Sequence, residues 1–254
     1  MSQAPLHIEN PSVLYLDGVT VSFDGFKALN SLSLLIEPGE MRAIIGPNGA
    51  GKTTMMDVIT GKTKPDEGTL LFNNHHDLTQ YDEAAVANLG IGRKFQKPSV
   101  IESLTIFENL EMSLKGGRSV WQALRHKLSS AQKNKLDEIL GMIDLGDQLH
   151  NLAGNLSHGQ KQWLEIGMLL GQEPELLLID EPAAGMTDEE TMKTAELFKE
   201  LAKSHSLMVV EHDMDFIDAL DCRVTVLNEG SVLAEGSLAS VKANDEVIEK
   251  YLGR

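Results

Sequence analysis

Residues 46–53 combine residue types and a spacing that suit the binding of a phosphate group. They fit the pattern G-x-x-x-x-G-K-[ST] and consist of Gly46, Pro47, Asn48, Gly49, Ala50, Gly51, Lys52 and Thr53. The glycines and the small alanine allow successive backbone N–H groups to turn inward onto an anion. Lys52 can then reach the outer phosphates of a nucleotide, and the hydroxyl of Thr53 can bind Mg²⁺. This segment therefore predicts a nucleoside triphosphate site.

Two consecutive acids, Asp180 and Glu181, follow the apolar run at residues 176–179. The run is too short to span a membrane and is typical of a strand that is buried on both faces. Ligands of α/β sheets bind at the carboxyl ends of the strands. We therefore expect Asp180 to contribute to the Mg²⁺ shell, and Glu181 to orient or deprotonate an attacking water.

The sequence around the phosphate loop predicts the elements that position it. Residues 41–45 are predicted to form a short buried strand, and residues 54–59 the first turns of a helix. The N-terminus of such a helix adds a partial positive charge at the phosphates, so Thr54 also belongs to the predicted nucleotide site. This strand–loop–helix unit, followed by a second strand that ends in acids, predicts an α/β fold with a buried parallel sheet.

A third motif, L-S-x-G-Q at residues 156–160, lies between the first two and precedes a helical pattern. By itself it is also typical of an ordinary helix N-terminus with Ser157 as the cap. Its position between a phosphate loop and a strand ending in Asp-Glu resembles the ATP-binding-cassette (ABC) ATPases, and the resemblance covers nearly the whole chain. In that family the motif, here Ser157, His158, Gly159 and Gln160, binds the γ-phosphate of ATP held by the opposite subunit. The resemblance thus implies a dimer.

The same resemblance assigns roles to three further positions. Phe23 matches an aromatic residue that stacks on adenine. Gln96 matches a glutamine that touches Mg²⁺ and moves with a transmembrane partner, and His212 matches a histidine that contacts the γ-phosphate. Before the family is considered, each of these residues has a plainer interpretation as a core or structural residue. The implied cofactors are ATP and Mg²⁺.

Two positions depart from the family pattern. The third residue of the L-S-x-G-Q motif is commonly Gly and here is His158, which removes backbone freedom at that point. After the two acids, Thr187 stands where the family commonly has Asp, and we assign it no catalytic role.

The resemblance implies a P-loop, RecA-like core with an inserted helical subdomain. We expect one ATP-binding domain over residues 12–254, with the core at about 12–96 and 166–254, the helical subdomain at about 97–165 and an N-terminal extension of residues 1–11. A possible capping box at Thr105 and Glu108 is expected to begin the helical part.

Composition limits the function classes. The 254 residues carry 22 Lys and Arg against 38 Asp and Glu, a formal net charge of −16, which disfavours a nucleic-acid partner. The one cysteine, Cys222, fits a reducing compartment and a buried thiol. We find neither a run of about 18 apolar residues nor a signal-peptide core, so we expect any membrane role to depend on partner proteins.

Finer resemblances point to ATPases of branched-chain-amino-acid-type importers and, within them, of bacterial urea importers. The segments that carry this resemblance are residues 92–98, 156–165, 183–187 and 210–214 and the C-terminal V-I-E-x-Y-L-G. The implied partners are a second ATPase, in a heterodimer or alternatively a homodimer, two transmembrane permeases and a periplasmic binding protein. The implied location is the cytoplasmic face of the bacterial inner membrane. An envelope-lipid exporter ATPase, a soluble ABC ATPase and a module that binds ATP without turnover remain alternatives.

Overall fold

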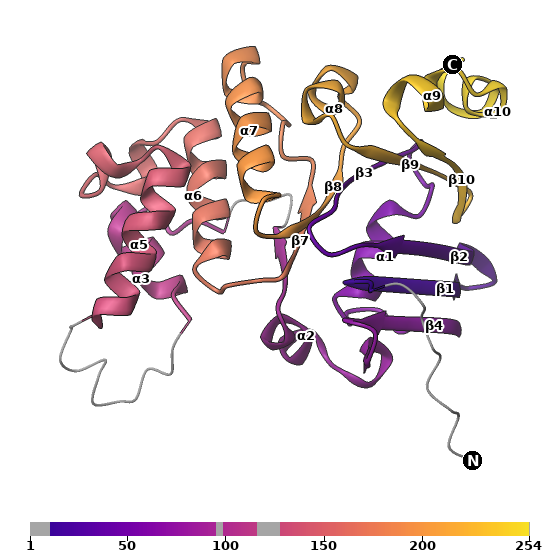
Figure 1. Ribbon diagram of the computed structural model, residues 1–254, viewed down its shortest axis with the longest axis horizontal. Helices are drawn as coiled ribbons and strands as arrows, with labels where there is room; N and C mark the ends of the chain where they lie inside the picture. The colour runs from indigo at the N-terminus through magenta and orange to yellow at the C-terminus, as the bar shows by residue number, and fades with distance from the viewer. Residues whose placement is uncertain (1–10, 95–98, 116–127, 254) are drawn as a thin grey trace.

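The computed structural model describes residues 11–94, 99–115 and 128–253, which form two β-sheets covered by helices (Figure 1). A four-stranded antiparallel sheet has the order β2-β1-β4-β5, and a six-stranded sheet has the order β10-β9-β3-β8-β7-β6. In the six-stranded sheet only the β9–β10 pair is antiparallel. The strands are β1 (Leu14–Phe23), β2 (Phe26–Ile36), β3 (Met41–Ile45), β4 (Glu67–Phe72), β5 (His76–Asp77), β6 (Ile91–Lys94), β7 (Leu176–Asp180), β8 (Ser206–Val210), β9 (Arg223–Asn228) and β10 (Ser231–Gly236).

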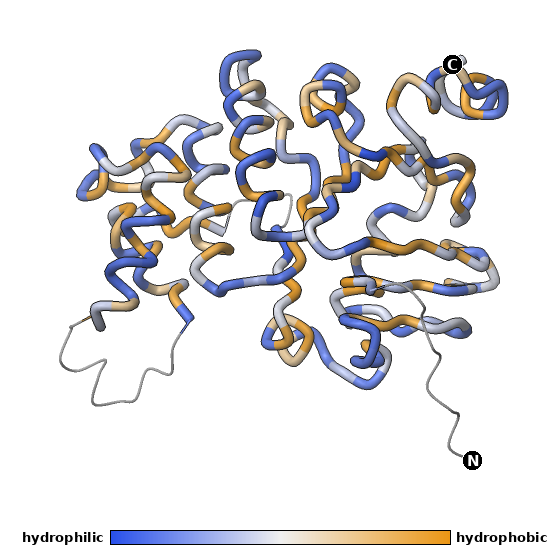
Figure 2. Tube along the Cα trace, in the orientation of Figure 1, coloured by the Kyte–Doolittle hydropathy of each residue, from blue (hydrophilic) through white to orange (hydrophobic). Residues whose placement is uncertain are grey.

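Helices cover both faces of the six-stranded sheet. The α-helices of the described residues are α1 (Lys52–Ile59), α2 (Glu83–Leu89), α3 (Ile106–Ser113), α5 (Ser130–Ile143), α6 (His158–Leu170), α7 (Asp188–Leu201), α8 (Met214–Leu220), α9 (Leu238–Lys242) and α10 (Asp245–Val247). Along the outer helices the trace alternates between hydrophobic and hydrophilic residues (Figure 2), as expected for helices with one buried face. The predicted strand at residues 41–45 and the helix after the phosphate loop are confirmed.

Strand β7 is buried on both faces because its side chains alternate between two hydrophobic clusters. Leu177 and Ile179 pack in the cluster formed by α3, α5, α6, α7 and α8. Leu176 and Leu178 pack in the cluster that includes α1 and the antiparallel sheet. A strand with this environment must be apolar throughout, which explains the uninterrupted run that ends at Asp180.

The helices α3, α5 and α6 form a group beside the sheet (Figure 1). The predicted capping box is confirmed, because the amide of Glu108 donates to Thr105 Oγ1 at 3.2 Å and the amide of Thr105 donates to Glu108 Oε2 at 2.7 Å. Helix α6 is continuous from His158 to Leu170 and therefore crosses the expected boundary at residue 165. Its carboxyl half packs on β6, so one helix belongs to both the helical group and the sheet.

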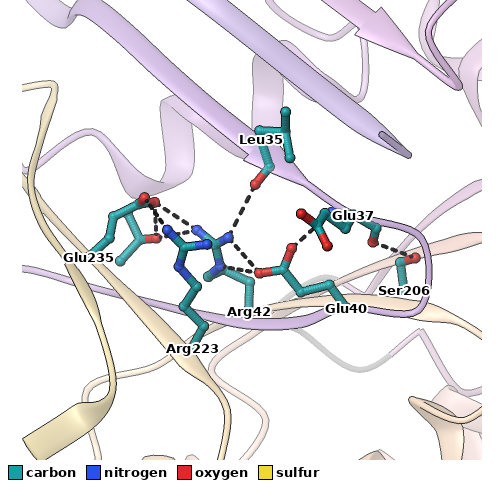
Figure 3. A network of polar contacts seen from close by, with 8 residues as sticks. Leu35, Glu37, Glu40, Arg42, Ser206, Arg223 and Glu235 are labelled. Carbon is teal, nitrogen blue, oxygen red and sulfur yellow. Dashed lines mark hydrogen bonds and ion pairs between the residues drawn. The ribbon is translucent and has the colours of Figure 1, made fainter. Parts of the chain in front are cut away.

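A buried arginine joins the two sheets (Figure 3). Arg42 on β3 is 1% exposed, and its Nη1 donates to Thr225 Oγ1 on β9 at 2.8 Å and to Glu235 Oε1 on β10 at 2.7 Å. Its Nε donates to Glu40 Oε1 at 2.6 Å, and its Nη2 donates to the carbonyl oxygen of Leu35 on β2 at 3.2 Å. All three guanidinium nitrogens therefore donate hydrogen bonds, and their acceptors come from separate parts of the chain.

We expect Arg42→Met to lower the free energy of unfolding by about 3 kcal/mol, because it leaves carboxylates without their buried cation. Urea denaturation of the purified chain measures this change. Arg223 is the matched control, since it binds the same Glu235 at 3.0 Å but is 53% exposed. Arg223→Met should cost about 0.5 kcal/mol. Equal losses for the two variants would contradict the role given to the buried site.

Cys222, which the sequence predicts to be a buried thiol, is only partly buried and packs against two hydrophobic clusters. Burial raises the pKa of Cys222 from 9.0 to about 11, although a hydrogen bond with the backbone of Ala43 opposes the shift. At neutral pH we therefore expect the folded chain to react with iodoacetamide about a hundred-fold more slowly than the urea-unfolded chain. Mass spectrometry of quenched samples measures both rates, and similar rates would contradict the burial of this thiol.

Candidate functional site

The phosphate loop connects the end of β3 to the start of α1. Its backbone requires glycine at two positions. Gly51 has a φ of +101°, and a Cβ there would lie 2.7 Å from the carbonyl oxygen of Ala28. Gly46 has a φ of +148°, and a Cβ there would lie 2.2 Å from the carbonyl oxygen of Leu227. The loop can therefore approach its neighbours only without side chains at these points.

Lys52 folds back across the loop. Its Nζ donates to the carbonyl oxygen of Gly46 at 2.6 Å and to that of Pro47 at 3.0 Å. Burial lowers the pKa of Lys52, and the carboxylates of Glu181 and Asp180 oppose this shift. The ammonium group is thus held at the mouth of the loop, beside the two acids.

A cavity of about 290 Å³ opens between the phosphate loop and the carboxyl end of β7. It brings together the lysine, the threonines and the two acids that the sequence singles out. Its lining consists of Phe26, Ala28, Asn48, Gly49, Gly51, Lys52, Thr53, Thr54, Asp180, Glu181 and Val210. Burial raises the pKa of Asp180, whereas the nearby Arg93 opposes the shift. A cation placed beside Asp180 would relieve the cost of burying its negative charge.

Glu181 occupies an uncommon backbone conformation with a φ of +46°. Its amide donates to the carbonyl oxygen of Val210 at 2.9 Å, which fixes the turn that leaves β7. His212 follows β8, is 65% exposed at its side chain, and places Nδ1 3.7 Å from Glu181 Oε1. The ends of β7 and β8 thus bring together two residues that lie far apart in the sequence.

Glu211 is a buried acid at this site that the sequence analysis did not identify. It is 1% exposed and lies between β8 and His212. Its Oε1 accepts a hydrogen bond from the amide of Ala183 at 3.0 Å, and its Oε2 accepts from the amides of His212 at 2.6 Å and Asp213 at 3.1 Å. The Glu-His-Asp run in the sequence was visible, but only the fold shows that the first of these acids points inward.

The aromatic residue that borders the cavity is Phe26, whereas Phe23 is not among its lining residues. The two rings lie on paired positions of the β1–β2 hairpin, on either side of the turn formed by Asp24 and Gly25. Both are exposed, at 50% for Phe23 and 65% for Phe26. The Asp-Gly turn is the signal that could have added Phe26 to the candidates, because such a turn makes its flanking residues neighbours.

The L-S-x-G-Q residues lie at the start of α6 and do not line the described cavity. Ser157 caps the helix, because the amide of Gln160 donates to its Oγ at 3.2 Å. The Ser157 hydroxyl also donates to Glu190 Oε1 on α7 at 2.8 Å. The structural interpretation of Ser157 as a helix cap is therefore confirmed.

The two residues that depart from the family pattern, His158 and Thr187, both lie at the segment between β7 and α7. His158 Nε2 lies 3.0 Å from the carbonyl oxygen of Ala184. Thr187 begins α7 as its cap, because the amide of Glu190 donates to Thr187 Oγ1 at 3.3 Å. A threonine therefore performs here the capping role for which Asp is also well suited. The predicted Gln96 lies outside the described residues, as do residues 1–10 of the expected extension.

The cavity suits a nucleotide phosphate and Mg²⁺. Loop N–H groups, the Lys52 ammonium and the start of α1 supply positive potential. Thr53 and Asp180 supply the kind of oxygen ligands that Mg²⁺ takes from a protein when phosphates and waters complete its shell. Residues 11–94, 99–115 and 128–253 contain no cluster of three or more His, Cys, Asp or Glu that could hold a metal without such help. In the same ranges no helix is long and apolar enough to cross a bilayer.

The loop, the lysine and the strand-end acids define a P-loop nucleotide-binding protein. Residues 29–184 match the family model described as ABC transporter, and the chain belongs to this family. It is 35% identical over 250 residues to the high-affinity branched-chain amino acid transport ATP-binding protein LivG of Escherichia coli K12, covering 95% of this chain and 98% of LivG. Membership of this family makes the chain an ATP-hydrolysing ABC ATPase and a transporter subunit.

Solved structures confirm the predicted fold class. The ADP conformation of an ATP-binding cassette of an ABC transporter matches with a TM-score of 0.82 and 31% identity, over 96% of this chain and 99% of that one. The dimeric structure of a bacterial ABC transporter cassette matches with a TM-score of 0.73 and 28% identity, over 89% of this chain and 98% of that one. The fold is therefore an ABC cassette with a P-loop core.

Proposed function

We propose that this chain hydrolyses ATP to power a bacterial importer of branched-chain amino acids or urea. The observation that carries the proposal is the convergence of Lys52, Thr53, Asp180 and Glu181 on one cavity, in a chain similar to LivG along nearly its whole length. LivG is a transport ATP-binding protein for branched-chain amino acids. The segments at residues 92–98 and 156–165, which resemble the D subunit of bacterial urea importers, support urea as the substrate over branched-chain amino acids.

In the proposed mechanism, the loop N–H groups and Lys52 bind the β- and γ-phosphates of ATP. Thr53, Asp180 and Gln96 would hold Mg²⁺, which supplies charge neutralisation at the phosphates. Glu181 orients the water for in-line attack and accepts its proton. His212 contacts the γ-phosphate, and the 3.7 Å separation between its Nδ1 and Glu181 Oε1 lets the two side chains act on neighbouring atoms.

The mechanism requires a second cassette. Residues 157–160 do not line the cavity of their own chain, and we propose that the exposed Ser157 and His158 meet the γ-phosphate bound by a partner. The dimeric structure of a related bacterial cassette supports such an arrangement. We propose a heterodimer with a different ATPase beneath two transmembrane permeases, at the cytoplasmic face of the inner membrane, with a periplasmic binding protein delivering the substrate. Phe23 remains our proposal for stacking on adenine, with Phe26 beside it.

Affinity capture tests the proposal. Tagged Glu181→Gln protein is captured from native membranes with ATP and Mg²⁺, and the co-purifying proteins are identified by mass spectrometry. A second cassette ATPase with two importer-type permeases is the expected result, and uptake of labelled leucine against labelled urea by the parent complex then identifies the substrate. Envelope-lipid export components, or soluble partners alone, would overturn the importer assignment. Binding of ATP without turnover by the parent complex would overturn the hydrolytic role.

A further inference from the structure

We propose that Glu211 is a positioning residue that holds His212 and the segment after Glu181 in one fixed arrangement. The inference rests on the proposed function, because it assigns Glu211 a task in the hydrolysis of ATP. It concerns the side chain's bonds to the protein backbone and involves no direct contact with the nucleotide.

The first step of the argument is what the carboxylate binds. Oε1 accepts from the amide of Ala183, two residues after Glu181. Oε2 accepts from the amides of His212 and Asp213 and lies 3.5 Å from His212 Nδ1. The backbone of Glu211 is itself anchored, because its amide donates to the carbonyl oxygen of Ile44 at 3.2 Å, immediately before the phosphate loop. One side chain therefore connects the segments that follow β7 and β8.

The second step is why an acid is needed at this position. Three N–H groups converge on the two oxygens of a side chain that is 1% exposed. A carboxylate has only acceptors, so it satisfies all three donors at once. Glutamine has nearly the same size, but its NH₂ group would face at least one of these N–H groups. The substitution would leave a buried donor unsatisfied and free one segment from the other.

The third step concerns the charge of the buried carboxylate. Three N–H donors point at this carboxylate. Lys94 at the end of β6 pairs with Glu165 at 3.5 Å and also interacts electrostatically with Glu211. His212 lies on the solvent side. The positive charge of Lys94 thus partly offsets the negative charge of Glu211, whose hydrogen bonds fix the backbone after β7 and after β8.

The fourth step is the consequence for chemistry. Glu181 and His212 approach each other at 3.7 Å only if the two segments keep their present separation. Misplacement of a catalytic group by about 1 Å costs roughly 10²-fold in rate. Loss of the Glu211 bonds should therefore lower kcat and leave the binding of ATP, which depends on the phosphate loop, nearly unchanged.

The test is Glu211→Gln in the full chain, assayed alone and with its captured partners. We expect kcat for ATP hydrolysis to fall about 10²-fold, with KM and the affinity for ATP changed less than about three-fold. In the nucleotide-free chain, NMR should show exchange of the Ala183, His212 and Asp213 amides at least about ten-fold faster, with core amides of β7 unaffected. Glu235→Gln, which removes a carboxylate charge in the distant Arg42 network, should change neither kcat nor these amides.

A double-mutant cycle separates positioning from general destabilisation. In a His212→Ala background, Glu211→Gln should lower kcat by less than about three-fold further, since the two changes remove parts of one arrangement. An undiminished loss in that background, an unchanged kcat in the single variant, or unchanged exchange of the three amides would each overturn the inference. If His212→Ala alone leaves hydrolysis unchanged, the proposed role of His212 fails instead.

If Glu211→Gln does not fold, Glu211→Asp provides the same test. Its carboxylate is one methylene shorter, so it can keep the local bonds to the amides of His212 and Asp213 while it loses the reach to Ala183. We expect kcat to fall at least about ten-fold and the Ala183 amide alone to exchange faster. Parent-like kcat together with a deprotected Ala183 amide would overturn the inference.

Discussion

Replacing Glu181 with glutamine is expected to lower kcat for ATP hydrolysis by about 10²- to 10³-fold while the affinity for ATP stays within about three-fold of the parent. Glutamine keeps the size of the side chain but cannot accept the proton of the attacking water. The phosphate loop and Lys52, to which we assign the binding of ATP, are unchanged. Phosphate release measures turnover, and titration with a fluorescent ATP analogue measures affinity.

The matched control is Glu173→Gln. Glu173 is exposed and has a φ of +53°, close to the +46° of Glu181, but it lies in the turn after α6 and does not line the cavity. Its substitution should leave kcat unchanged, which separates the chemistry of Glu181 from any effect of its uncommon backbone conformation. Near-parent hydrolysis by Glu181→Gln would remove Glu181 from the catalytic role.

Replacing Lys52 with methionine is expected to weaken ATP binding by at least about 10²-fold. The ammonium group lies within 3.0 Å of two loop carbonyl oxygens and lines the cavity, and we propose that it binds the outer phosphates there. Methionine fills similar space but supplies neither positive charge nor hydrogen bonds, and a charge-assisted bond to phosphate is worth several times a neutral one. Isothermal titration of ATP in the presence of Mg²⁺ measures the change.

Lys62→Met serves as the control for Lys52→Met. Lys62 lies shortly after α1 and pairs with Asp57 at 3.0 Å, but it is 52% exposed and absent from the cavity lining. Its loss should alter ATP affinity by less than about two-fold, because exposed ion pairs contribute little. Equal weakening in both variants would indicate that general charge, rather than the position of Lys52, governs binding.

Residues whose roles follow from local sequence could be predicted. The phosphate loop, its strand and helix, the acids at the end of β7 and the Thr105 capping box each depend on neighbours within a few positions. Glu211 could not be predicted, because its burial depends on the amide of Ala183, 28 residues away, turning toward it. Phe26 was not among the predicted site residues for a related reason. Which of the two exposed rings borders the cavity depends on how the β1–β2 hairpin lies against the phosphate loop.

The boundary of the helical group illustrates a different limit. A periodic pattern predicts that a helix follows the L-S-x-G-Q motif, but it does not say on what each half of that helix packs. In the structure, a Cβ at Gly167 would lie 2.8 Å from Ile143 of α5, while Leu169 lies against Gly92 of β6. The boundary between the helical group and the sheet therefore cannot be placed from sequence position alone, because helix α6 packs on both.

The bonds of Arg42 restrict how the molecule can deform. One buried guanidinium is bonded to β9 and β10 within its own sheet and to the carbonyl oxygen of Leu35 on β2 of the antiparallel sheet, so sliding one sheet over the other would break this last hydrogen bond. We therefore expect the two sheets to move as a single rigid block. Any hinge that accompanies ATP turnover should lie where α3, α5 and α6 meet that block. Because helix α6 packs on both the helical group and the sheet, we expect it to transmit motion from one to the other.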